Sequence, residues 1–213
     1  LTIVGRLRQT PAYVLMMVAM GLGTLSGVGF GFWGPELFAR AYAMDPVQAK
    51  SAFAISFGLS GLVGILAFGA LSDRLSRRDI VWPLRLSAIA LGCATAMILC
   101  ATWSDSFHVA LLFAVPSGLL GGGWSVGFMA MLQYLLPIPF RASGTALFLA
   151  VTTLMGFFLG PWLAGEISAQ MGTGGDALRI GLTAVIPVGF VGALLAWWAS
   201  TRIEGDRAAL ALP

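Results

Sequence analysis

Residues that could carry out chemistry are scarce in this sequence, because only 10% of its 213 residues are charged. Ser125, in the string Gly123-Trp124-Ser125-Val126-Gly127, is the residue most like a nucleophile. A nucleophilic serine needs a base within about 3 Å. The single histidine, His108, is expected on the same helix about 25 Å away, at roughly 1.5 Å per residue. We therefore expect no catalytic residue, and one histidine leaves no set of metal ligands.

Charged side chains gather in one short segment, Gly69–Arg78, between two apolar runs. We interpret it as a loop in which Asp73 faces a helix N-terminus or an arginine of a partner. Gly69 would permit close helix approach, and the arginines would stay at the membrane surface. The residues of this candidate signature segment are Gly69, Leu71, Asp73, Arg74, Arg77 and Arg78.

Six long stretches without Asp, Glu, Lys or Arg are the elements that must position these residues. They are Gln9–Pro35, Ser51–Ser72, Leu86–Ser104, Ser106–Phe140, Ala142–Gly165 and Ile180–Thr201. Each is close to or longer than the roughly 20 residues with which a helix crosses a bilayer. Inside lipid the backbone must satisfy its own hydrogen bonds, so such runs form helices. The sequence predicts an all-α integral membrane protein of six spanning helices in one domain, 1–213.

The expected helices cover residues 11–40, 46–71, 82–103, 107–134, 141–170 and 177–202. Asp45-Pro46 resembles an N-cap followed by proline at the first helical position. Nine of the Lys and Arg residues fall on the side of the termini and three, Arg40, Lys50 and Arg179, on the other. The positive-inside rule then places both termini in the cytoplasm.

Glycine is abundant, with 28 residues, and small residues at spacings of three or four allow membrane helices to pack closely. We interpret Gly58, Gly61 and Gly64 in the second span, and Gly118 and Gly121–Gly123 in the fourth, as packing residues. In the fifth span, glycine and proline together predict a bendable helix. The expected bend residues are Gly156, Gly160, Pro161 and Gly165.

The segment Gly69–Arg78 resembles the cytoplasmic signature of the major facilitator superfamily, which reads Gly, any, Leu, small, Asp, Arg, any, Gly, basic, basic. It departs from that pattern at Ser76, where the family usually has glycine. Residues Arg141–Ala146 and Gly160–Ser168 resemble helix 11 of spinster-like members, and Phe32–Pro35 resembles their helix 7. The resemblance covers nearly the whole chain.

This resemblance implies a six-helix half of a twelve-helix transporter, namely the C-terminal half, with an N-terminal half absent from the sequence. The implied function is secondary transport by alternating access in a bacterial inner membrane. Spinster-like members suggest an amphipathic small molecule or lysolipid as substrate, and a coupling proton or ion is expected. The partners would be the substrate, the missing half and the lipid bilayer, without nucleic acid.

In the superfamily, helices 1, 2, 4 and 5 of each half line a central cavity between the halves. If this chain follows the same arrangement, polar and aromatic residues of its first, second, fourth and fifth spans are expected to line the cavity. Glu36 could meet a cationic head group at the outer mouth. The expected cavity residues are Thr24, Trp33, Glu36, Ser60, Trp124 and Thr152.

Three alternatives stay open or are set aside. The substrate could be a sugar, an organic acid or a drug, and the six helices could form a scaffold that does not transport. An intramembrane rhomboid protease also has six spans. It has glycine directly after its serine and a histidine on its sixth span, whereas this chain has Val126 after the serine and no histidine on its sixth span. There is no nucleotide-binding loop, and no cofactor or enzymatic activity is expected.

Overall fold

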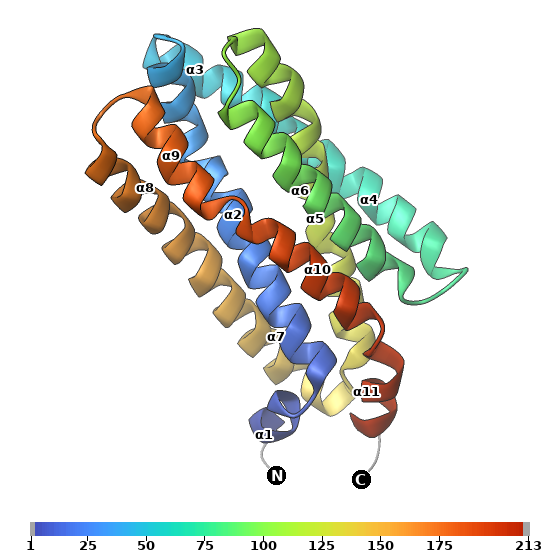
Figure 1. Ribbon diagram of the computed structural model, residues 1–213. Coiled ribbons are helices and arrows are strands. Elements are labelled where there is room, and N and C mark those ends of the chain that lie inside the picture. The colour runs from blue at the N-terminus through green and yellow to red at the C-terminus, as the bar shows by residue number, and fades with distance from the viewer. Residues whose placement is uncertain (1–2, 211–213) are drawn as a thin grey trace.

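The computed structural model describes residues 3–210, which form helices joined by short turns (Figure 1). No strand occurs among these residues, and the predicted all-α fold is confirmed. Six helices are long and apolar enough to cross a membrane. They are Pro11–Ala41, Pro46–Ser76, Trp82–Thr102, Phe107–Leu135, Ile138–Met171 and Gly175–Ser200.

Several of these helices are divided into shorter elements. The elements are α1 (Ile3–Arg8), α2 (Pro11–Ala41), α3 (Pro46–Phe53), η1 (Ala54–Leu59), α4 (Ser60–Ser76), α5 (Trp82–Thr102), α6 (Phe107–Leu135), α7 (Ile138–Thr153), η2 (Leu154–Leu159), α8 (Gly160–Met171), α9 (Gly175–Val185), α10 (Val188–Ser200) and α11 (Ile203–Leu210). Elements η1 and η2 are π-helical turns within the second and fifth spans. The two termini lie at the same end of the bundle (Figure 1).

The second span begins as its sequence predicts. The Asp45 carboxylate accepts hydrogen bonds from the backbone N–H groups of Val47 and Gln48, at 3.0 and 3.3 Å. Pro46 occupies the first turn, where its missing N–H costs nothing. This cap satisfies two of the donors that a helix N-terminus leaves free.

The end of this span differs from the expectation. The helix expected to end at Leu71 continues to Ser76, so Asp73 and Arg74, expected in a loop, lie in the last turns of α4. The Ser76 hydroxyl donates to the Asp73 carbonyl at 2.9 Å. Charged side chains end the apolar stretch but not the helix, because nothing between Gly69 and Ser76 prevents helical hydrogen bonding.

The π-helical turn η2 has a cause in the sequence. Pro161 follows it, lacks an N–H group and would crowd the carbonyl four residues earlier in a regular helix. A wider turn before Pro161 relieves that crowding. Residues Gly156 to Pro161, expected to permit a bend, therefore coincide with a local widening of the helix.

Helices α4 and α6 approach until their backbones touch. A Cβ atom at Gly64 would overlap the Leu119 carbonyl, and one at Gly122 would overlap the Gly61 carbonyl. On another side of α6, a Cβ atom at Gly127 would overlap the Pro83 carbonyl of α5. Glycine is therefore required at these positions for the helices to pack as they do.

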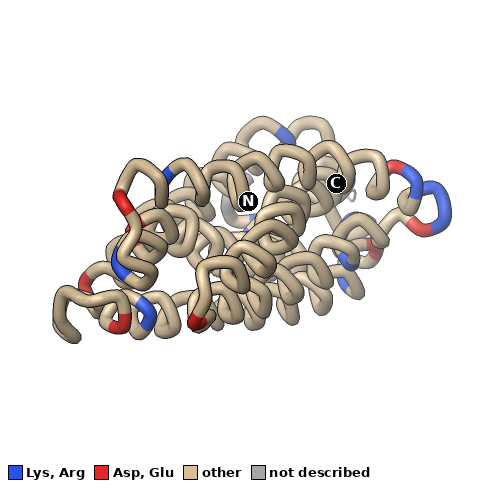
Figure 2. Tube along the Cα trace, turned by 90° about the horizontal axis from the view of Figure 1, so that it is seen from above, with Lys and Arg blue, Asp and Glu red and all other residues tan. Residues whose placement is uncertain are grey.

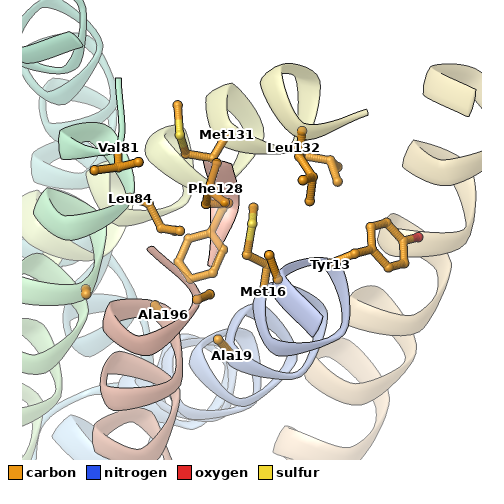
Figure 3. Close-up of a cluster of buried hydrophobic side chains, with 14 of the residues drawn as sticks. Tyr13, Met16, Ala19, Val81, Leu84, Phe128, Met131, Leu132 and Ala196 are labelled. Atoms are coloured by element: carbon orange, nitrogen blue, oxygen red, sulfur yellow. The ribbon is translucent and has the colours of Figure 1, made fainter. Parts of the chain in front are cut away.

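The interior contains two clusters of buried apolar side chains. The first lies toward the end of the bundle that carries the termini, and Figure 3 shows Phe128 pointing toward Met16 within it. At its edge the Tyr13 hydroxyl donates to the Gly144 carbonyl at 2.7 Å, which links α2 to α7. The second cluster, which includes Phe30, Phe38 and Phe53, lies toward the opposite end.

Charged residues lie mainly at the two ends of the bundle and leave its middle uncharged (Figure 2). This distribution is that of a protein whose middle faces hydrocarbon. Large apolar side chains such as Leu66, Leu112 and Leu194 are about 70% exposed there, which only lipid or another apolar surface can cover.

The contact between α4 and α6 gives a first prediction. Gly122→Ala should lower the stability of the folded protein by about 1–3 kcal/mol, because the new methyl group overlaps the Gly61 carbonyl. Thermal unfolding of the purified protein measures the loss. Gly92→Ala is the matched control, since its Cβ atom would meet only Ala193 at 3.7 Å. Equal melting temperatures for the two variants would contradict the packing role of Gly122.

Candidate substrate cavity

A cavity of about 760 Å³ lies among α2, η1, α4, α5, α6, α7 and η2. Its size falls within the roughly 300–1,000 Å³ typical of small-molecule sites. Leu62, Ile65 and Phe157 line it and are also exposed at the surface, at 56%, 47% and 65%, so the cavity is open on their side. These three residues belong to the second and fifth spans.

The structure brings together three of the six residues expected in the cavity. Thr24 of α2, Trp124 of α6 and Thr152 of α7 all line it. Trp33, Glu36 and Ser60 do not. Substrate contact by the first three remains a prediction.

Each of the other three residues has a contact elsewhere. The Trp33 indole N–H donates to the Pro161 carbonyl at 2.8 Å and so links α2 to α8. Glu36 forms an ion pair with Arg40 at 2.7 Å, one helical turn further along α2. The Ser60 hydroxyl donates to the Phe57 carbonyl at 3.1 Å, within its own helix.

Most hydroxyl groups of the cavity wall are already satisfied by backbone carbonyls. The Thr24 hydroxyl donates to the Met20 carbonyl at 2.7 Å, and the Thr152 hydroxyl donates to the Leu149 carbonyl at 3.2 Å. The Ser26 hydroxyl donates to the Ile186 carbonyl of the sixth span at 2.8 Å. These groups present mainly methyl and methylene surface to the cavity. A wall rich in such residues is therefore less polar than its sequence suggests.

Three polar groups in the wall are left without a partner. Among residues 3–210, the Ser125 and Thr153 hydroxyls and the Trp124 indole N–H make no hydrogen bond. Trp124 as a whole is only 7% exposed, but its indole nitrogen is not fully buried, so the N–H remains accessible at the cavity wall. These groups are thus available to a bound molecule.

Among residues 3–210, no Asp, Glu, Lys, Arg or His lines the cavity. A charged group placed there without a counter-charge would lose its hydration without compensation. The described residues also contain no group of three or more His, Cys, Asp and Glu side chains that could hold a metal ion. This wall alone is therefore suited to binding an uncharged, mainly apolar molecule or part of a molecule.

Sequence reasoning missed Ser125, Thr153 and a set of glycines as wall residues. Ser125 was considered only as a nucleophile, although it directly follows Trp124 on the same helix. The interpretation of Gly58 as a packing residue was wrong within this chain, because a Cβ atom there would meet nothing within 4 Å. Glycine alone does not distinguish tight contact from open space.

The signature segment lies apart from the cavity, near the end of the bundle that carries the termini. Asp73, Arg74, Arg77 and Arg78 are exposed, and Asp73 forms no ion pair with any of residues 3–210. A Cβ atom at Gly69 would meet nothing within 4 Å, so this glycine permits no close contact inside the described chain. Any role of these residues therefore involves a surface outside it.

The opposite end of the bundle is closed by a polar cluster. The Arg179 guanidinium donates to the Ser104 carbonyl at 2.8 Å and forms an ion pair with the Asp176 carboxylate at 3.2 Å. The Tyr42 hydroxyl also donates to the Ser104 carbonyl, at 2.9 Å. Burial raises the pKa of Tyr42, and its hydrogen bond with Arg179 opposes that shift. Tyr42 therefore stays a neutral donor that ties α2 to the turn after α5.

Known proteins share both the sequence pattern and the fold. An MFS-type efflux pump of Mycolicibacterium smegmatis is 26% identical over 204 residues, which are 94% of this chain and 47% of the pump. A bacterial homologue of the human lysosomal transporter Spinster, in an inward-facing and occupied conformation, matches 93% of this chain and 50% of its own with a TM-score of 0.80 at 17% identity. Its unoccupied inward-facing form matches with a TM-score of 0.82 at 16% identity.

The chain has the fold of a major facilitator half. It spans about half the length of the curated relative that it matches. No family model matches the sequence. In this half, the cavity lies between the first, second, fourth and fifth spans, with α5 of the third span behind them.

The position of Trp33 gives a second prediction. Trp33→Phe should lower stability by about 1 kcal/mol, because the Pro161 carbonyl loses its indole donor. Trp124→Phe is the matched control, since the Trp124 indole N–H has no partner to lose among the described residues. Thermal unfolding of both variants tests the difference. An unchanged melting temperature for Trp33→Phe would show that the α2–α8 link contributes nothing measurable.

Proposed function

We propose that this chain is the C-terminal half of a secondary transporter that moves amphipathic small molecules across a membrane by alternating access. The cavity described above carries the proposal. It is large, mainly apolar and open on the side of the second and fifth spans, which are the least buried spans of the chain. An N-terminal half placed against these spans would complete the cavity, as in two-half transporters that rock about a shared site.

The cavity wall favours an amphipathic substrate over a sugar. A sugar needs many hydrogen bonds in a buried site, whereas this wall offers unpaired groups only at Trp124, Ser125 and Thr153 among the described residues. Lysolipids and apolar drugs present large apolar surfaces that match the wall. The name of the related efflux pump agrees with transport but specifies no substrate.

The charges that drive transport are expected on the other half. Coupling to a proton or ion normally uses an ionisable residue inside the membrane. No carboxylate of the described residues lines this cavity. Glu36 and Glu166 both accept side-chain hydrogen bonds on their own helices, from Arg40 and Gln170. We therefore assign the coupling residue to the N-terminal half.

The distribution of arginine sets the orientation that we propose. Arg74 lies in the last turn of α4, and Arg77 and Arg78 directly follow it. This end of α4 lies at the end of the bundle that carries both termini (Figure 1), and the positive-inside rule supports a cytoplasmic location for it. Lys50 and Gly174 then face the outside of a bacterial inner membrane.

Reconstitution of the complete transporter in liposomes tests the function. We expect transport of a fluorescent lysolipid and no transport of a labelled sugar, because the wall lacks the donors and acceptors that a sugar requires. The 213-residue chain alone should transport neither, since it supplies one wall of the site. Transport of the sugar alone would favour the alternative substrate class, and activity of the short chain would contradict the half-transporter assignment.

The signature segment gives a prediction of its own. Asp73 has no ion-pair partner among residues 3–210, so we expect it to contact the other half in one conformation of the cycle. Asp73→Asn in the complete transporter should then shift the balance of conformations by about 5- to 150-fold and reduce transport. Glu204→Gln on α11 is the control, because it removes an exposed carboxylate at the same end of the bundle. Equal rates for both variants would contradict the contact.

A further inference from the structure

The cavity wall contains glycine residues from three helices, and they are not alike. Some are required by neighbouring helices, whereas others face open space. The glycine residues that line the cavity are Gly23, Gly27, Gly31, Gly58, Gly61, Gly118, Gly121 and Gly122.

The first kind holds helices together. A Cβ atom at Gly118 would overlap the Ser60 hydroxyl and the Phe57 carbonyl, and one at Gly122 would overlap the Gly61 carbonyl. At Gly23 the added atom would lie 2.9 Å from the side chains of Leu91 and Trp124. Packing explains these positions without reference to a ligand.

The second kind has no such explanation. A Cβ atom at Gly27 or at Gly58 would meet nothing within 4 Å, and at Gly31 or Gly121 it would meet only the Phe57 ring, at 3.7 and 3.8 Å. Glycine inside a helix lowers its stability relative to alanine. At Gly27 and Gly58 that cost is offset by no contact among the described residues, and both glycines keep space free inside the cavity.

The chemistry of the remaining wall indicates what occupies this space. Within the part of the chain that the structure describes, no ionisable residue lines the cavity and the Trp124 indole N–H has no acceptor. A ring system or branched chain with a hydrogen-bond acceptor would fill the volume and pair that donor. A charged group would find no counter-charge on this half.

We infer that Gly27 and Gly58 set the size of the group that the cavity accepts, and that this group is a bulky, uncharged and mainly apolar part of the substrate. The inference rests on the proposed transport function and specifies which part of the substrate this half binds. Side chains at these two positions would occupy the space of the ligand and leave the fold intact.

Two uncharged dyes that differ by one phenyl ring, N-phenyl-1-naphthylamine and 1-naphthylamine, test the size limit. Their binding to the complete transporter in lipid nanodiscs is measured by fluorescence, with empty nanodiscs subtracted. Gly27→Leu and Gly58→Leu should weaken binding of the larger dye by about tenfold or more and that of the smaller dye by less than about threefold. The affinity of Gly27→Ala for the larger dye should lie between those of Gly27→Leu and the parent.

Ala67→Leu is the matched control, because Ala67 is exposed on α4 and does not line the cavity. It should change the binding of neither dye. Melting temperatures are measured for every variant, and Gly27→Leu and Gly58→Leu should match the parent within the error of Ala67→Leu.

Several results would overturn the inference. If binding of both dyes were weakened equally, or if the melting temperature fell strongly, Gly27 and Gly58 would be shown to pack against the other half. Unchanged binding of the larger dye would remove them as size determinants, and no binding of either dye to the parent would refute the inferred ligand class. Transport of a lysolipid in that last case would leave the proposed function standing, whereas absence of all transport would refute the function itself.

Discussion

The contact between the backbones of α4 and α6 is the constraint on which the cavity depends. Lipid tails are as apolar as the side chains, so apolar burial alone cannot hold helices together in a membrane. Close approach at Gly61 and Gly122 instead brings many atoms into van der Waals contact. Helix α6 uses Gly127 in the same way against α5. It is thereby fixed between two neighbours, and Trp124, one position from Gly123 and two from Gly122, is held at the cavity wall.

The same rule that forms the helices makes the wall apolar. Backbone carbonyls within a membrane are satisfied internally, and hydroxyl groups on a helix readily donate to them. Thr24, Thr95 and Thr152 all do so within their own helices. Their polarity is used locally, and among residues 3–210 the wall groups that remain for a ligand are the Trp124 indole N–H and the Ser125 and Thr153 hydroxyls. In the proposed transporter, such a wall would bind the apolar part of the substrate, and the polar part would be bound by the other half.

The number and position of the spans could be predicted from the sequence, because the bilayer reduces that question to the length of uncharged runs. The rotation of each helix could not. Lipid and protein interior are both apolar, so hydrophobicity does not show which face of a span is buried. This is why Trp33, on the same helix as Thr24, was expected in the cavity but contacts Pro161 of α8. The helical end of α4 was also missed, because charge marks the membrane boundary and not the end of the helix.

The two π-helical turns show how the second and fifth spans come to share one role. One extra residue in a turn rotates everything that follows by about 100° around the helix axis, relative to a regular helix of about 3.6 residues per turn. In η2 the widening follows from Pro161, whereas η1 contains no proline and the Ser60 hydroxyl after it donates to the Ser56 and Phe57 carbonyls. Both turns place a phenylalanine, Phe57 or Phe157, at the cavity. The wall residues continue from η1 into α4 in the second span, and from α7 into η2 in the fifth span, so each turn lies at one end of the part of its span that lines the cavity.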